Sequence, residues 1–114
     1  MEIKDAVPAL AALAQETRLA VYRMLVEAGP AGLAAGKIAE DLGVAAATLS
    51  FHLKELSNAG LTQSRQSGRF VIYSANFEAM NALLAFLTAN CCRGDANACL
   101  TPAELQCCPP VSSS

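Results

Sequence analysis

Residues 37–61, "KIAEDLGVAAATLSFHLKELSNAGL", contain two helical patterns that are separated by a glycine. Ala39, Gly43 and Leu49 have the spacing of a helix-turn-helix. In that motif a small residue lets the helices cross, a glycine makes the turn and an apolar residue anchors the second helix. Gly43 also suits the left-handed backbone position just beyond a helix end. The first helix is therefore predicted to begin at Leu33 and end at Gly43, and the second to begin after Gly43 and end at Gly60.

The second of these helices is predicted to have a buried stripe and an outward face, because successive side chains are about 100° apart around a helix axis. The buried stripe consists of Leu49, Leu53 and Leu56. The outward face consists of Ala47, Ser50, Phe51 and Lys54, with Thr48 and His52 at its flanks. Small and hydroxyl side chains near the start of such a helix can enter the major groove of DNA and meet base edges. For His52, packing or a phosphate contact is favoured over metal ligation.

Beyond Gly60 the pattern changes to that of strands. Residues 61–65 and 69–74 are predicted strands around the turn signal Ser67-Gly68. Three side chains around the hairpin tip can reach phosphates or the minor groove. They are Arg65, Gln66 and Arg69. Lys37 can contact the DNA backbone from the preceding helix. Because basic residues are sparse, the expected electrostatic attraction to DNA is modest.

Three further helices are predicted from the spacing of apolar residues. They cover residues 3–14, residues 17–28 and the stretch that follows Asn76, with Thr17 and Asn76 as the expected N-caps. The second of them is expected to turn four side chains inward, which are Leu19, Tyr22, Leu25 and Val26. In the last helix, alternating steps of three and four residues form the seam of a helix that packs on a partner helix. The seam consists of Phe77, Met80, Leu84, Leu87 and Cys91.

The predicted fold is mainly α with a small β-hairpin, in the order helix-helix-helix-helix-strand-strand-helix. This order is that of a winged helix-turn-helix. A chain of 114 residues is long enough for one domain and too short for two. We assign residues 1–92 to a DNA-binding and dimerisation domain and residues 93–114 to a C-terminal tail.

Composition limits the other classes of function. The net charge is −2, so a nucleic-acid partner requires local positive charge. No apolar run approaches the roughly 20 residues that cross a bilayer, so a membrane partner is not expected. The N-terminus opens with acidic residues instead of a basic region, which does not favour a secretory signal. A cytoplasmic location is therefore expected, and stable structural disulfides are rare there.

All five cysteines lie in the last 25 residues, at Cys91, Cys92, Cys99, Cys107 and Cys108. Thiolates select soft or thiophilic ions, and no histidine is near enough in sequence to complete a Cys/His site. Trivalent arsenic or antimony takes three sulfurs in a pyramid. Cys91, Cys92 and Cys99 can supply them if the helix frays at its end and the chain turns back at Gly94. Cys107 and Cys108 can replace one thiol, hold a second ion or take no part.

The same cysteines leave other hypotheses open. A redox sensor can form a disulfide between Cys92 and Cys99, or between the two tails of a dimer. Zinc can bind four of the five thiols, although adjacent pairs are not the usual Cys-x2-Cys knuckle. A thiol metal buffer explains the tail but not the hairpin. An enzyme is not expected, because no general base lies near these thiols in sequence.

Three segments resemble the ArsR/SmtB family of bacterial metal-responsive repressors: "ETRLAVYRMLVEAG", "KIAEDLGVAAATLSFHLKELSNAGL" and "RQSGRFVIYSAN". The most specific piece, "TLSFHLKELSNAGL", is similar to that family's Ser-x-His-Leu-x-x-Leu-x-x-Ala-Gly-Leu recognition pattern. The resemblance covers about Pro8 to Leu87. It implies a homodimer, joined through the first and last helices, that binds operator DNA as an inverted repeat and releases it when an inducer binds.

The resemblance also implies which residues act. Thr48, Ser50 and His52 would lie on or beside the reading face, and Arg65 and Arg69 on the wing. Three inducer sites known in the family lack their ligands in this sequence. The helix before the turn and the recognition helix hold no cysteine, and the last helix offers only Glu78. What remains resembles the arsenite-responsive repressors whose thiols lie at the end of the last helix. The implied inducer is As(III), with Sb(III) as a second.

Overall fold

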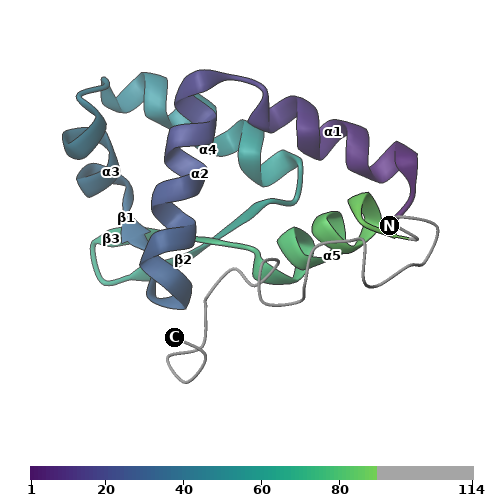
Figure 1. Ribbon diagram of the computed structural model, residues 1–114. Coiled ribbons are helices and arrows are strands. Elements are labelled where there is room, and N and C mark those ends of the chain that lie inside the picture. The colour runs from purple at the N-terminus through teal and green to yellow at the C-terminus, as the bar shows by residue number, and fades with distance from the viewer. Residues whose placement is uncertain (90–114) are drawn as a thin grey trace, which may run out of the picture.

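The computed structural model describes residues 1–89, which form a winged helix-turn-helix with five α-helices, a short 3-10 helix and three strands. The elements in chain order are α1 (Ile3–Leu13), α2 (Glu16–Ala28), η1 (Gly29–Ala31), β1 (Leu33–Ala34), α3 (Ala35–Leu42), α4 (Ala46–Asn58), β2 (Thr62–Ser67), β3 (Phe70–Ala75) and α5 (Phe77–Leu87). In Figure 1, α1 and α5 lie at one end of the molecule and the hairpin tip at the other. The predicted fold class is confirmed.

The helix-turn-helix forms as its sequence pattern predicts. Gly43 ends α3 in the left-handed conformation, with φ 66° and ψ 33°, and its N–H donates to the carbonyls of Ala39 and Glu40. The N–H of Val44 also donates to the Ala39 carbonyl, at 3.1 Å. These bonds satisfy carbonyls that the end of α3 would otherwise leave open. They fix the direction in which the chain enters α4.

The strands form an antiparallel sheet in the order β1-β3-β2. The hairpin pairs Thr62 with Ala75 and Ser67 with Phe70, so each strand is slightly displaced from its predicted bounds. The sequence interpretation placed Leu33 and Ala34 in a helix, whereas they form β1 and pair with Tyr73 and Ile72. That interpretation is wrong because two residues are too few to show a strand period.

Two helix starts illustrate local capping. The Asn76 side chain accepts from the N–H of Ala79 at 3.1 Å, which confirms it as the N-cap of α5. The prediction of Thr17 as the cap of α2 is wrong. Gln15 is the cap, and its side chain accepts from the N–H of Arg18 at 2.8 Å. An amide oxygen serves this position as a hydroxyl would, because the helix requires only an acceptor there.

The core is small and consists of aliphatic and alanine side chains. Its largest fully buried members are Val21, Leu25, Ile38, Leu49, Leu53, Leu56 and Leu61. Leu19 is 45% exposed, so its predicted inward position is wrong. Leu87, predicted for a seam that faces a partner helix, is 54% exposed within one chain. In α5 the buried residue is Leu83, which the predicted seam omits. Among residues 1–89, no helix is long and apolar enough to cross a membrane.

Candidate nucleic-acid interface

Helix α4 has the two faces that its sequence predicts. Leu49, Leu53 and Leu56 are at most 2% exposed and hold the helix against the core. The opposite side carries exposed small, hydroxyl, aromatic and basic side chains. They are Ala47, Thr48, Ser50, Phe51 and Lys54. The first turn has no side-chain cap, so N–H groups there can donate to a phosphate oxygen. This face can hydrogen-bond to base edges and contact the DNA backbone at once.

His52 does not lie on that face. Its side chain is 8% exposed, and Nδ1 is 3.3 Å from Nη1 of Arg18 in α2. The 100° step places it beside the buried stripe, on the flank that α2 covers. Of the two roles expected for His52, packing and a phosphate contact, this geometry favours packing.

The hairpin, which forms the wing, carries the polar side chains that the sequence singles out. Arg65, Gln66 and Arg69 are all exposed. Nη2 of Arg65 donates to the carbonyl of Ala31 at 2.8 Å, which holds this guanidinium against η1. Nε2 of Gln66 donates to the carbonyl of Gly68 at 3.0 Å and braces the turn. Arg69 lies in the turn between β2 and β3, where a cation can meet a phosphate or the minor groove.

The remaining predicted contact, Lys37, is exposed on α3. Its Nζ is 3.2 Å from a carboxylate oxygen of Asp41, one helical turn further along. An exposed pair of this kind contributes little stability, so a phosphate can compete for the lysine. The acidic partner lowers the local positive charge, in keeping with the modest electrostatic attraction expected from the composition.

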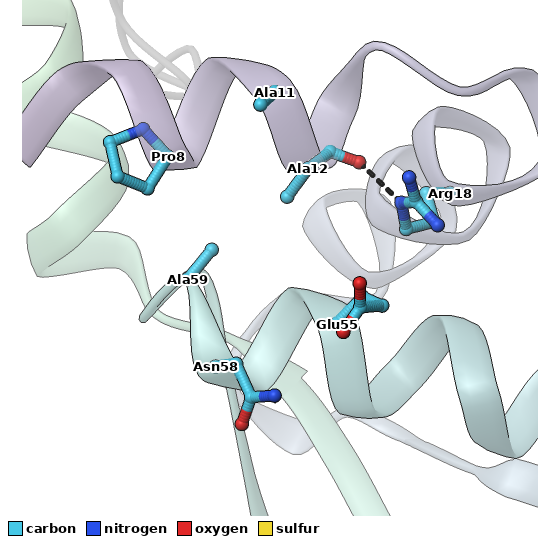
Figure 2. A pocket seen from close by; sticks show the side chains of 7 residues that line it. All are labelled: Pro8, Ala11, Ala12, Arg18, Glu55, Asn58 and Ala59. Atoms are coloured by element: carbon cyan, nitrogen blue, oxygen red, sulfur yellow. Dashed lines mark hydrogen bonds between the residues drawn. The ribbon is translucent and has the colours of Figure 1, made fainter.

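A pocket of about 310 Å³ lies between α1, the start of α2 and the second half of α4. Its lining residues are Pro8, Ala11, Ala12, Arg18, Glu55, Asn58 and Ala59. Figure 2 shows Arg18 at one end of it, where Nε donates to the carbonyl of Ala12 at 2.7 Å. The sequence interpretation missed Arg18. Its partners are six and 34 residues away, so no local pattern reveals them.

The proposed inducer residues cannot be placed in this geometry. Cys91, Cys92, Cys99, Cys107 and Cys108 lie outside the described residues, as does the predicted boundary between domain and tail. Within residues 1–89, no group of three or more His, Cys, Asp or Glu side chains is arranged to hold a metal ion.

Comparison with known proteins agrees with this architecture. A family model described as a helix-turn-helix domain matches residues 13–65. The HTH-type transcriptional regulator YgaV of Escherichia coli K12 is 32% identical over 84 residues, covering 74% of this chain and 83% of the relative.

Two solved structures are similar to this chain in their three-dimensional fold. An ArsR-like transcriptional regulator from Rhodococcus sp. RHA1 superposes with a TM-score of 0.69 and 27% identity, covering 83% of this chain and 87% of that one. Reduced HlyU from Vibrio cholerae N16961 superposes with a TM-score of 0.60 and 31% identity, covering 75% of this chain and 90% of that one.

Proposed function

The chain belongs to the ArsR-type helix-turn-helix transcriptional regulators, and from this premise we propose that it represses arsenic-resistance genes and leaves its operator when As(III) binds its C-terminal thiolates. Sb(III), which takes the same three-sulfur geometry, is the second inducer that we propose. The observation that carries the proposal is the placement of the cysteines. All five come after α5 in the sequence, between residues 91 and 108, and no cysteine precedes them.

Operator binding is supported by the exposed face of α4. Thr48 and Ser50 offer hydroxyl groups to base edges, Lys54 offers a cation to a phosphate, and Arg69 extends the contact along the wing. These groups are exposed polar side chains on the two elements that a winged helix presents to DNA.

A homodimer is supported by an unusual distribution of side chains on α1. The residues that α1 buries in its own chain are Ala6, Ala9 and Ala12. Three of its larger apolar residues face outward, with Ile3 69%, Val7 56% and Leu10 41% exposed. Their spacing of four and three places them on one face of the helix. An apolar stripe of this kind is typical of a surface that a second copy covers.

Such a dimer explains both the DNA target and the regulation. Two copies of α4 held about 34–36 Å apart match half-sites one duplex turn apart, and the two-fold symmetry of a dimer makes the operator an inverted repeat. The proposed inducer site begins at Cys91, four residues beyond the end of α5 at Leu87. Binding there can change how α5 meets the partner subunit. A coupling free energy of about 1–3 kcal/mol between inducer and operator is enough for release of DNA.

Thiol oxidation is the second candidate, and the likeness to a structure described as reduced HlyU favours it. In this version the same tail forms a disulfide, between Cys92 and Cys99 or between the tails of a dimer. Oxidation in place of metal binding would then alter the end of α5.

The test is a titration of the full-length reduced chain on fluorescent DNA from upstream of its own gene. As(III), Sb(III), Zn(II), Cd(II) and hydrogen peroxide are added separately. Release by As(III) and Sb(III) supports the proposal. Release by peroxide alone, reversed by reductant, supports the redox sensor, and release by Zn(II) or Cd(II) but not As(III) rejects arsenic as the inducer.

Single Cys→Ser variants then locate the site. Cys91→Ser, Cys92→Ser and Cys99→Ser are expected to bind DNA and to lose the response to As(III). Cys107→Ser and Cys108→Ser are the matched controls from the same tail. If Cys99→Ser responds fully while Cys107→Ser does not, the third thiol is that of Cys107 and not that of Cys99.

A further inference from the structure

Phe51 is a large apolar side chain on the otherwise polar outward face of α4. It is 56% exposed, although an aromatic ring of its size usually contributes to a core or an interface. It lies next to Ser50 in the sequence, and Lys54 follows one helical turn later. The ring is therefore part of the surface that meets DNA in the proposed function.

The ring also contacts a buried neighbour. It meets the His52 ring edge to face, with centroids 5.5 Å apart and planes at 62°. His52 is itself buried and hydrogen-bonded to Arg18, whose Nε is held by the carbonyl of Ala12. Phe51 thus rests on a series of contacts that begins at the end of α1. A side chain whose rotamers are restricted by such a contact has less conformational entropy to lose in a complex.

The chemistry of the major groove specifies what such a ring can contact. Base edges there present hydrogen-bond donors and acceptors, and the one apolar group on an unmodified base is the C5-methyl of thymine. We propose that Phe51 packs against a thymine methyl group in each operator half-site and determines specificity for thymine at that position. This inference rests on the proposed function, because it requires α4 to enter the major groove.

The expected effect of the contact is modest. Removing one buried methyl group weakens binding about 4-fold, from the free energy of burying a group of that size. Removing it from both half-sites weakens a dimer about 15-fold, because the two contributions multiply.

The test first selects preferred sites from random duplex DNA with the full-length chain. Each thymidine of the selected site is then replaced symmetrically by deoxyuridine, which removes only the methyl group. We expect one position per half-site at which the wild type loses about 15-fold in affinity. Phe51→Ala is expected to bind both DNAs equally. Phe70→Ala, which removes a ring that is 62% exposed on the wing, is the matched control and should retain the full loss.

The outcomes separate this inference from the function on which it rests. A wild type that selects no DNA rejects both. A wild type that selects a site without any deoxyuridine effect, or a Phe51→Ala variant that retains it, rejects only the role of Phe51. Because Phe51 is exposed, its variant should unfold at the same urea concentration as the wild type. A site that carries cytosine at that position should also be bound more tightly when the cytosine is replaced by 5-methylcytosine, which adds a methyl group. This gain is expected for the wild type and not for Phe51→Ala.

Discussion

Nη1 of Arg18 lies 3.3 Å from Nδ1 of His52, and this contact joins the first turn of α2 to the middle of α4. The same guanidinium donates through Nε to the carbonyl of Ala12, at the end of α1 (Figure 2). A guanidinium only donates, so Nδ1 must accept, and the His52 proton lies on Nε2 in a neutral ring. One side chain therefore connects the proposed dimerisation helix to the reading helix.

Replacing Arg18 is expected to weaken both folding and DNA binding. Arg18→Ala removes two hydrogen bonds and leaves two acceptors without their donor, at a cost of about 1–3 kcal/mol in the free energy of unfolding. Arg18→Lys should recover little of this, because an ammonium group lacks the planar fork that reaches both acceptors. Urea denaturation measures the first effect and operator titration the second. Arg23→Ala, an exposed arginine on the same helix, is the control, and an equal loss there would contradict the role of Arg18.

Gly32 determines whether β1 can pair with β3. Its backbone has φ 72° and ψ −171°, a region that glycine alone occupies readily. A Cβ added there would overlap the carbonyl oxygen of Tyr73. We expect Gly32→Ala to cost about 3 kcal/mol or more in the free energy of unfolding, since backbone strain and overlap both contribute.

Gly36→Ala is the matched control for this prediction. Gly36 lies in α3, and a Cβ added there would have no neighbour within 4 Å. The substitution is expected to stabilise the protein by about 0.5–1 kcal/mol, because alanine loses less backbone entropy than glycine in a helix. Two substitutions of the same type should thus shift the urea midpoint in opposite directions. A similar loss for both would show that Gly32 is not special.

Asn76 fixes the start of α5 in two ways. Its side-chain oxygen caps the helix, and its Nδ2 donates to the carbonyl of Gly60 at 3.1 Å. Asn76→Ala is expected to lower the free energy of unfolding by about 1–2 kcal/mol. Asn76→Asp should lose less, because a carboxylate keeps the cap and gives up only the donor. Asn81→Ala, an exposed position on the same helix, should change stability by less than about 0.5 kcal/mol.

Elements whose apolar residues repeat with a clear period could be predicted from the sequence, whereas long-range packing could not. The leucine stripe of α4 has a clear helical spacing, so its facing was predicted correctly. The same spacing places His52 on a flank, but whether α2 or solvent covers that flank depends on tertiary packing. Leu33 and Ala34 are too few to show a period, and their pairing requires Tyr73, about forty residues further along. The cysteines lie outside the described residues, so the inducer site stays a prediction from the sequence.

The salt dependence of operator binding tests whether Lys54 meets a phosphate. Neutralising one phosphate on duplex DNA contributes about 0.9 to the slope of log affinity against log salt. A dimer presents Lys54 twice, so Lys54→Gln should reduce the magnitude of the slope by about 1.8 and weaken binding to all sequences alike. Lys4→Gln removes an exposed lysine from α1, away from the reading face, and should leave the slope unchanged. A Lys54→Gln variant with a wild-type slope but altered base preference would instead place this lysine on a base edge.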